Sequence, residues 1–232
     1  PVLTRTTVGR VAQSGHGFRV ETQNGDWLCR AVVLATGGFN NPVIPRLADS
    51  IPASIQQLSA RSYRNPEQLR PGGVLIVGAS ATGLQLAQEI QLSGRPVTLA
   101  VGEHVRLPRV YRDRDIQWWM LATGVLDQRI EDADDPDRAR RVPSPQLVGT
   151  PDRATLDLNV LQAQGVRIVG RLMAVRDCKA QFSGSLRNVC ALADLKMDRL
   201  LTWIDQWAEA NNPFDIGPVE RFAPTLIGKA PE

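Results

Sequence analysis

The sequence predicts an α/β fold with a parallel sheet, preceded by an antiparallel β-meander. Two observations carry this prediction. The first thirty or so residues alternate in polarity between tight turns, as antiparallel strands do. Later a strand pattern, an amphipathic helix pattern and a second strand pattern follow one another within about 30 residues, the length of a parallel βαβ unit.

The composition suits a globular protein with a core. The chain has 232 residues, of which 43% are hydrophobic. Its 27 basic and 24 acidic residues give a net charge of +3, which provides no electrostatic reason to expect nucleic acid or an anionic membrane surface as partner. The longest apolar run, residues 31–35, is far shorter than the ~20 residues of a membrane helix. We therefore expect a small-molecule substrate, while the oligomeric state stays open.

The cysteines and the first residue also bear on the class of protein. Cys29, Cys178 and Cys190 are scattered, with no Cys-x-x-Cys pair and no companion histidines. This pattern predicts a reducing, cytoplasmic compartment and argues against a structural zinc or a redox cysteine pair. Because the chain opens with Pro1 and strand-like sequence, we expect a partial chain.

The meander is predicted to begin near Val8. Gly15-His16-Gly17 makes one turn, and Asn24-Gly25, a strong hairpin signal, makes the next. Residues 31–35 are continuously apolar, which predicts a strand buried on both faces that stops at Thr36-Gly37-Gly38. A proline-rich connection then runs from residue 39 to 72.

The βαβ unit is predicted next. Residues 74–77 are a second buried strand, and Pro96 introduces another over residues 97–101. Between them one apolar stripe falls at i, i+3, i+4 and i+7: Gly83, Leu86, Ala87 and Ile90. Ser93-Gly94 ends this helix. The predicted domains are residues 1–70 and 71–232.

The remaining chain gives coarser signals. We expect a helix over residues 115–122, with Trp118 and Trp119 in its packing face, and short strands over residues 166–169 and 181–182. A last helix carries the apolar residues Met197, Leu200, Leu201, Ile204 and Trp207. Asp194 is predicted to cap it and Asn211-Asn212-Pro213 to end it.

A glycine turn stands between the strand at 74–77 and the helix. It consists of Gly78, Ala79, Ser80, Ala81, Thr82 and Gly83. In this context Gly78 allows a sharp turn, Gly83 lets the helix approach the strand, and the helix N-terminus faces a pyrophosphate. Ser80 replaces the usual middle glycine, and its hydroxyl could bind phosphate. We therefore predict a Rossmann-like domain that binds a nicotinamide dinucleotide.

Three related motifs are excluded because residues that they require are missing from this sequence. A P-loop needs Gly-Lys-Ser/Thr, but Leu84-Gln85 follow Gly83. A hydrolase elbow needs glycine at the position of Thr82. Short-chain dehydrogenases need a Tyr-x-x-x-Lys pair, which neither tyrosine provides, because Glu67 and Asp115 occupy the lysine positions.

The choice between NAD and NADP depends on the residues after the second strand. An acidic residue there binds the ribose of NAD, whereas a cation accepts the extra phosphate of NADP. Glu103 lies 25 residues after Gly78, and His104, Arg106 and Arg109 follow it. Three potential cations beside one carboxylate favour NADP over NAD.

The chain resembles the flavin-containing monooxygenase group of FAD- and NADPH-dependent oxidoreductases. Two features carry the resemblance: Ala35-Thr36-Gly37 followed by Asn41-Pro42-Val43-Ile44-Pro45, and Tyr63-Arg64-Asn65-Pro66 leading through residues 72–78 to Thr82-Gly83. They are similar to the link between the family's flavin and nicotinamide domains, and to the start of its NADPH fold.

The resemblance implies a function and site residues. Residues 1–70 would be part of an FAD-binding domain, with Thr36 and Gly37 on the flavin side, and the glycine turn would hold the NADPH pyrophosphate. Hydride would pass from NAD(P)H to flavin. In a monooxygenase the reduced flavin would then activate oxygen, whereas a plain NADPH:flavin oxidoreductase would lack that step. The fragment itself could be inactive. The alternative is a flavin-free module that binds the dinucleotide without catalysis.

Overall fold

The structure, a computed structural model, describes residues 2–37, 41–150 and 152–228. The chain divides into two compact units, Pro1–Val43 and Ile44–Glu232. The sequence instead predicts a boundary between residues 70 and 71 that separates a flavin-binding part from a nicotinamide-binding part, and this boundary stays a prediction. In the ranges just given, no helix is long and apolar enough to cross a membrane.

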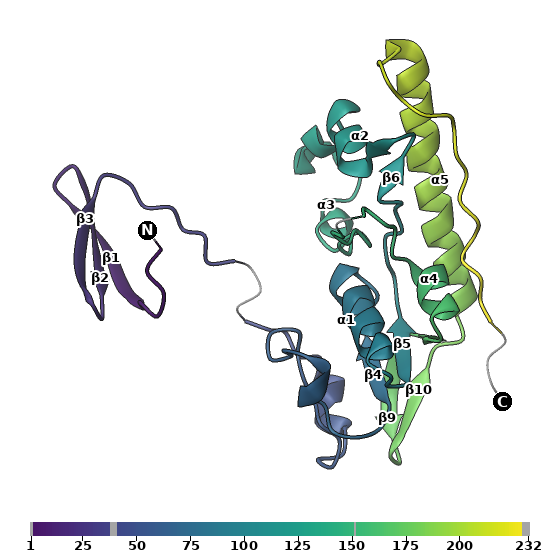
Figure 1. Ribbon diagram of the computed structural model, residues 1–232, viewed down its shortest axis with the longest axis horizontal. Helices are drawn as coiled ribbons and strands as arrows, with labels where there is room; N and C mark the ends of the chain where they lie inside the picture. Colours follow the sequence, from purple (N-terminus) through teal and green to yellow (C-terminus); the bar gives the residue numbers. More distant parts are fainter. Residues whose placement is uncertain (1, 38–40, 151, 229–232) are drawn as a thin grey trace. The chain divides into compact units, whose positions relative to one another are not determined.

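The first unit contains the predicted β-meander, drawn in purple in Figure 1. Its strands are β1 (Val8–Ser14), β2 (Gly17–Thr22) and β3 (Gly25–Cys29), paired antiparallel in the order β1-β2-β3. Gly25 has φ of 111°, a conformation that favours glycine and explains the Asn-Gly signal. The meander prediction is confirmed.

The predicted strand over residues 31–35 is wrong. These residues are not in a strand, and Val33 and Leu34 are 86% and 78% exposed. A strand buried on both faces needs neighbours that pair with it and cover it. Among the described residues the sheet of this unit stops at three strands, so the apolar run has no partner. Gly38, where the strand was predicted to stop, lies outside the described residues.

The proline-rich connection contains only two short 3-10 helices in its described part. They are η1 (Arg46–Ser50) and η2 (Pro66–Gln68). The side chain of Asn65 accepts a hydrogen bond from the Gln68 amide and so caps η2. The prediction of an irregular segment is confirmed for the residues that the structure describes.

The second unit is built on a parallel sheet in the order β4-β5-β8. Strand β4 (Val74–Val77), helix α1 (Ala81–Leu92) and strand β5 (Val97–Val101) form the predicted βαβ unit, and β8 (Arg167–Gly170) pairs with β5. Both predicted strands are confirmed to the residue.

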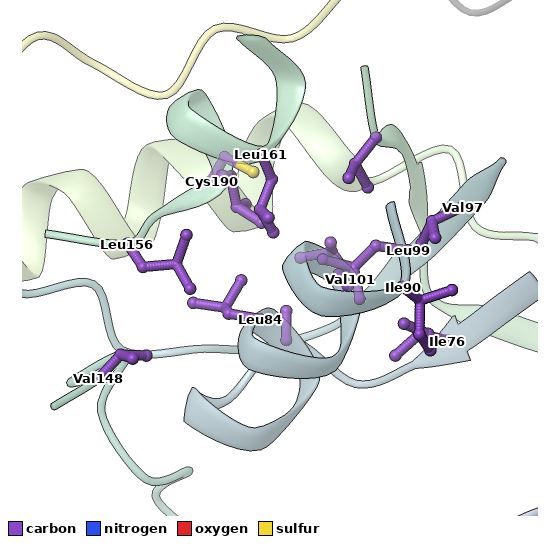
Figure 2. Packing of buried hydrophobic residues seen from close by; sticks show 14 residues of the cluster. Ile76, Leu84, Ile90, Val97, Leu99, Val101, Val148, Leu156, Leu161 and Cys190 are labelled. Atoms are coloured by element: carbon purple, nitrogen blue, oxygen red, sulfur yellow. The ribbon is translucent and has the colours of Figure 1, made fainter. Parts of the chain in front are cut away.

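One face of α1 packs against this sheet. Leu84, Ala87 and Ile90 are fully buried among Leu99 and Val101 of β5. Figure 2 shows Ile90 next to Ile76 of β4 and Leu84 pointing toward Leu156; Leu161 of helix α4 (Leu158–Ala163) and Cys190 of helix α5 (Leu186–Asn211) belong to the same cluster. The apolar stripe therefore includes Leu84 in place of Gly83. Gly83 instead lies close to the backbone of the glycine turn, as predicted.

The prediction that β4 is buried throughout needs correction. Ile76 is 9% exposed, but Leu75 and Val77 are 41% and 55% exposed. Strand β4 forms one edge of the three-stranded sheet, and α1 covers only the face that carries Ile76. The strand is consequently buried on one face.

The rest of the unit adds a second core and a long helix. The elements are β6 (Val110–Tyr111), β7 (Arg114–Asp115), α2 (Ile116–Ala122), η3 (Val125–Asp127), η4 (Ile130–Asp132), α3 (Pro136–Ala139), α4 (Leu158–Ala163), β9 (Leu172–Arg176), β10 (Lys179–Phe182) and α5 (Leu186–Asn211). Trp119 is fully buried against α5, as predicted, whereas Trp118 is 38% exposed beneath the Arg114 guanidinium. Asp115 caps α2.

Helix α5 begins earlier than predicted. Its N-cap is Ser185, so Asp194 lies inside the helix and is not its cap. The helix ends at Asn211, and Asn212 takes a left-handed conformation, as the Asn-Asn-Pro signal predicts. The following segment runs back along α5, where Thr225 donates two hydrogen bonds to Asp194 (Figure 1).

Candidate dinucleotide-binding site

The glycine turn lies at the carboxyl edge of the parallel sheet. Gly78 directly follows β4, has φ of 111° and donates its amide hydrogen to Ala100 of β5. A Cβ atom on Gly83 would overlap the carbonyl oxygen of Gly78. Both positions therefore require glycine, for backbone conformation and for close approach respectively.

The N-terminus of α1 opens from this turn. Ser80 is its N-cap, and the first helical hydrogen bond runs from the Leu84 amide to the Ser80 carbonyl. The amide groups of residues 81–83 precede that bond and so have no partner within the helix. The first turn holds no acidic residue, and Ser80 makes no side-chain capping bond to the helix amides. Such an end favours an anion.

A residue far along the chain supports the turn from inside the unit. Gln146 is 2% exposed, its amide Nε2 donates to the Ala79 carbonyl at 2.8 Å, and its backbone amide donates to Val105 at 2.8 Å. The sequence analysis missed Gln146, because a lone glutamine in a loop carries no local signal for a contact 67 residues away.

Glu103 and His104 follow β5 at the same edge of the sheet. Val77 pairs with Ala100, so the ends of β4 and β5 are neighbours. Glu103 is exposed and forms an ion pair with Lys196 of α5 at 3.3 Å. The pair places a carboxylate and an ammonium group next to the predicted ribose position.

His104 is buried in the same place. Its Nδ1 lies 3.0 Å from the Gly102 carbonyl, so Nδ1 carries the proton and Nε2 is left as an acceptor. Burial lowers the pKa of His104, which favours the neutral ring, although the Gly102 carbonyl and Asp194 oppose that shift. Nε2 has no hydrogen-bond partner among the residues that the structure describes.

The two predicted arginines are both engaged by carboxylates. Arg106 is 5% exposed and binds Asp157 and Asp194, each at 2.7 Å, and the Ala223 carbonyl at 2.9 Å. Burial by itself would lower the pKa of Arg106, but the hydrogen bonds to Asp194 and Asp157 outweigh it and raise the pKa.

Arg109 forms an ion pair with Asp115 at 2.6 Å. Both guanidinium groups are thus paired with carboxylates in this structure, and their predicted contact with the cofactor phosphate stays a prediction.

Thr36 and Gly37 belong to the other unit. Both are exposed, and Gly37 has φ of 74°. Their predicted contact with the flavin stays a prediction.

Comparison with known proteins places this site in a family. The family model described as pyridine nucleotide-disulphide oxidoreductase matches residues 1–121, which include the meander, the glycine turn and β5. An uncharacterized CzcO-like oxidoreductase of Geobacillus kaustophilus is 36% identical over 131 residues, 56% of this chain and 37% of that protein.

Two further matches are flavin proteins by name. The flavin-containing monooxygenase iboF of Amanita muscaria is 39% identical over 77 residues, 31% of this chain and 14% of that protein. A solved flavin-containing monooxygenase from Stenotrophomonas maltophilia matches with a TM-score of 0.48 at 21% identity, over 79% of this chain and 47% of that chain.

The alignments with the bacterial relatives span little more than a third of their length. Since the family model covers more than half of the chain and ends beyond the glycine turn and β5, this chain belongs to the pyridine nucleotide-disulphide oxidoreductase family.

Proposed function

We propose that the chain is the nicotinamide-binding part of an FAD-dependent oxidoreductase of monooxygenase type that takes its electrons from NADPH. The glycine turn binds the dinucleotide pyrophosphate, and Thr36 and Gly37 lie on the flavin side. When bound, NADPH supplies a hydride and FAD accepts it. The substrate is a small molecule.

The geometry of the glycine turn is the observation that carries this proposal. A pyrophosphate needs hydrogen-bond donors and room for its oxygen atoms. The turn offers the amides of residues 81–83 and the Ser80 hydroxyl, and Gly78 is exposed, so the approach is open. A Cβ atom on Gly78 would meet no other atom within 4 Å, and Gln146 contacts the turn through the Ala79 carbonyl.

The residues of this chain would bind and orient the dinucleotide. The dipole of α1 and its free amides hold the negative charge of the pyrophosphate. Gln146 fixes the Ala79 carbonyl, which keeps the turn in the shape that the glycines allow. Glu103, at the neighbouring strand end, marks the ribose side.

Substituting Gly83 tests the binding site. We expect Gly83→Ala to abolish binding of NADPH and of NADH, because the new methyl group would displace the Gly78 carbonyl and deform the turn. Calorimetric titration of the 232-residue chain measures both affinities. Gly184→Ala is the matched control, since a Cβ atom there meets no other atom within 4 Å.

Equal binding by wild type and Gly83→Ala would contradict the proposal. Circular dichroism spectra of both variants establish that the helices and strands are retained, so that a loss of affinity can be assigned to the site.

Flavin reduction distinguishes the oxidoreductase from a binding module without flavin. We expect the product of the complete gene to be yellow and its flavin absorbance to bleach when NADPH is added without oxygen. A colourless product that still binds NADPH would support the flavin-free alternative and contradict the flavin part of the proposal.

A further inference from the structure

A segment far from the glycine turn in the sequence lies beside the backbone that leaves β5. Residues 142–148 are in no helix or strand, and Pro145 forms an isolated parallel bridge with Val105. The Gln146 backbone amide donates to the Val105 carbonyl at 2.8 Å. Two contacts therefore attach this segment to the chain just after β5.

The side chain of Gln146 makes a second attachment, to the turn after β4. Its Nε2 donates to the Ala79 carbonyl at 2.8 Å. Ala79 stands between Gly78 and the N-cap Ser80, so its carbonyl lies outside the hydrogen bonds of α1. Among the described residues no other donor reaches this carbonyl. Gln146 thus joins the glycine turn to the backbone that follows β5.

The residues next to Gln146 hold it in place. Figure 2 includes Val148, which is 4% exposed in the first core cluster, and Leu147 packs against the second cluster. Pro143 and Pro145 restrict the backbone of the segment. The amide group of Gln146 is consequently presented to the turn from a segment that both cores anchor.

The amide group of Gln146 adds little net stability to the fold. The residue is 2% exposed, and its Oε1 has no donor in the part of the chain that the structure describes. The bond to Ala79 is favourable, but a buried acceptor without a donor costs free energy of similar size. The distinct effect of this amide is therefore on the position of the Ala79 carbonyl.

We infer that Gln146 is a positioning residue for the dinucleotide, because it fixes the spacing between the glycine turn and the backbone after β5. The proposed pyrophosphate site lies at the turn, and Glu103, on the proposed ribose side, stands two residues before Val105. A dinucleotide contacts both sides at once, so it binds best when their spacing is set in advance. This inference rests on the proposed function, since it concerns the same site.

Replacing the amide by a thioether tests the inference. Methionine is unbranched like glutamine but has no N–H group, so it fills the space without the bond to Ala79. We expect Gln146→Met to weaken NADPH and NADH alike, each about tenfold, the effect of one buried hydrogen bond. Calorimetric titration of the 232-residue chain measures both affinities. Wild-type affinities in the variant, or a loss confined to NADPH, would overturn the inference.

Gln162→Met is the matched control. Gln162 Nε2 donates to the Leu226 carbonyl at 2.6 Å, so this variant removes the same kind of bond away from the glycine turn. We expect its affinities to equal those of wild type. Equal weakening in the two variants would overturn the inference, because the loss would not depend on the turn. Failure of wild type to bind either dinucleotide would instead remove the proposed function itself.

Gln146→Glu provides a rescue. A neutral carboxyl group can donate to the Ala79 carbonyl, whereas a carboxylate only accepts, and burial favours the neutral form in mild acid. The ligand is NADP⁺, which is stable in acid. We expect the ratio of variant to wild-type dissociation constants to fall toward one at about pH 5. A ratio that stays near ten there would overturn the role of the hydrogen bond.

Discussion

Arg106 illustrates how the surroundings of a charged residue set its role. Its side chain is 6% exposed, and the guanidinium bridges Asp157, in a loop before α4, and Asp194 of α5. Removing one partner of a buried ion pair leaves the other charges in a medium of low polarity without compensation.

We therefore expect Arg106→Ala to lower the free energy of unfolding by about 3–5 kcal/mol. Urea denaturation followed by circular dichroism measures this change. Arg140→Ala is the control, since its pair with Asp137 is exposed on both sides, and such pairs contribute about 0–1 kcal/mol. Similar losses in the two variants would contradict the interior role of Arg106.

His104 makes stability depend on pH in a defined direction. Burial lowers its pKa in the folded protein, with Arg106 and Lys196 adding to the shift and Asp194 opposing it. Below the ordinary value of 6.5, the unfolded chain therefore binds more protons than the folded one. The contribution of His104 is complete above that pH and is lost as the pH falls from that value to the folded pKa.

We expect the free energy of unfolding to decrease between neutral pH and the folded pKa of His104, and His104→Asn to flatten that part of the curve. The asparagine amide can still donate to the Gly102 carbonyl, so the variant keeps one hydrogen bond of the histidine. Urea titrations at several pH values measure the slope. An identical slope in both proteins would refute this assignment.

At the scale of elements, β4 is the strand whose burial differs between its two faces. Ile76 points into the core beneath α1, whereas Val77 is 55% exposed. Truncating a buried isoleucine removes apolar burial and leaves a cavity, but truncating an exposed valine does neither.

We expect Ile76→Ala to cost about 2–5 kcal/mol of unfolding free energy, and Val77→Ala about 0.5 kcal/mol or less. Both changes lie in the same short strand, so each serves as the control for the other. A large loss in Val77→Ala would mean that the second face of β4 is covered in solution.

The prediction of elements succeeded where the signal is local. The strands at 74–77 and 97–101 are apolar runs bounded by glycine or proline, and both were found to the residue. Residues 31–35 carry the same pattern but lack a pairing partner among the described residues. The first turns of α5 were missed because their buried residues are Cys190 and Ala193, which give a weak apolar pattern.

At the scale of the whole molecule, the dinucleotide site belongs to one unit. The glycine turn, Gln146 and Glu103 all lie within Ile44–Glu232. We expect residues 44–232, expressed alone, to bind NADPH with the affinity of the whole chain, as measured by calorimetry. A shortened protein that is folded but has lost NADPH would show that residues 1–43 contribute to the site.

The sequence by itself determined the βαβ unit, the glycine turn and the family resemblance, because a sharp bend and a helix end place demands on the residues next to them. Only the tertiary structure decided which charges are available to a ligand. Arg106 and Arg109 stand beside Glu103 in the sequence, yet their partners include Asp157 and Asp194, 51 and 88 residues beyond Arg106. A guanidinium group is neutralised by whichever carboxylate the fold brings near, and for Arg106, unlike Arg109 with its neighbour Asp115, that carboxylate is not near in the sequence.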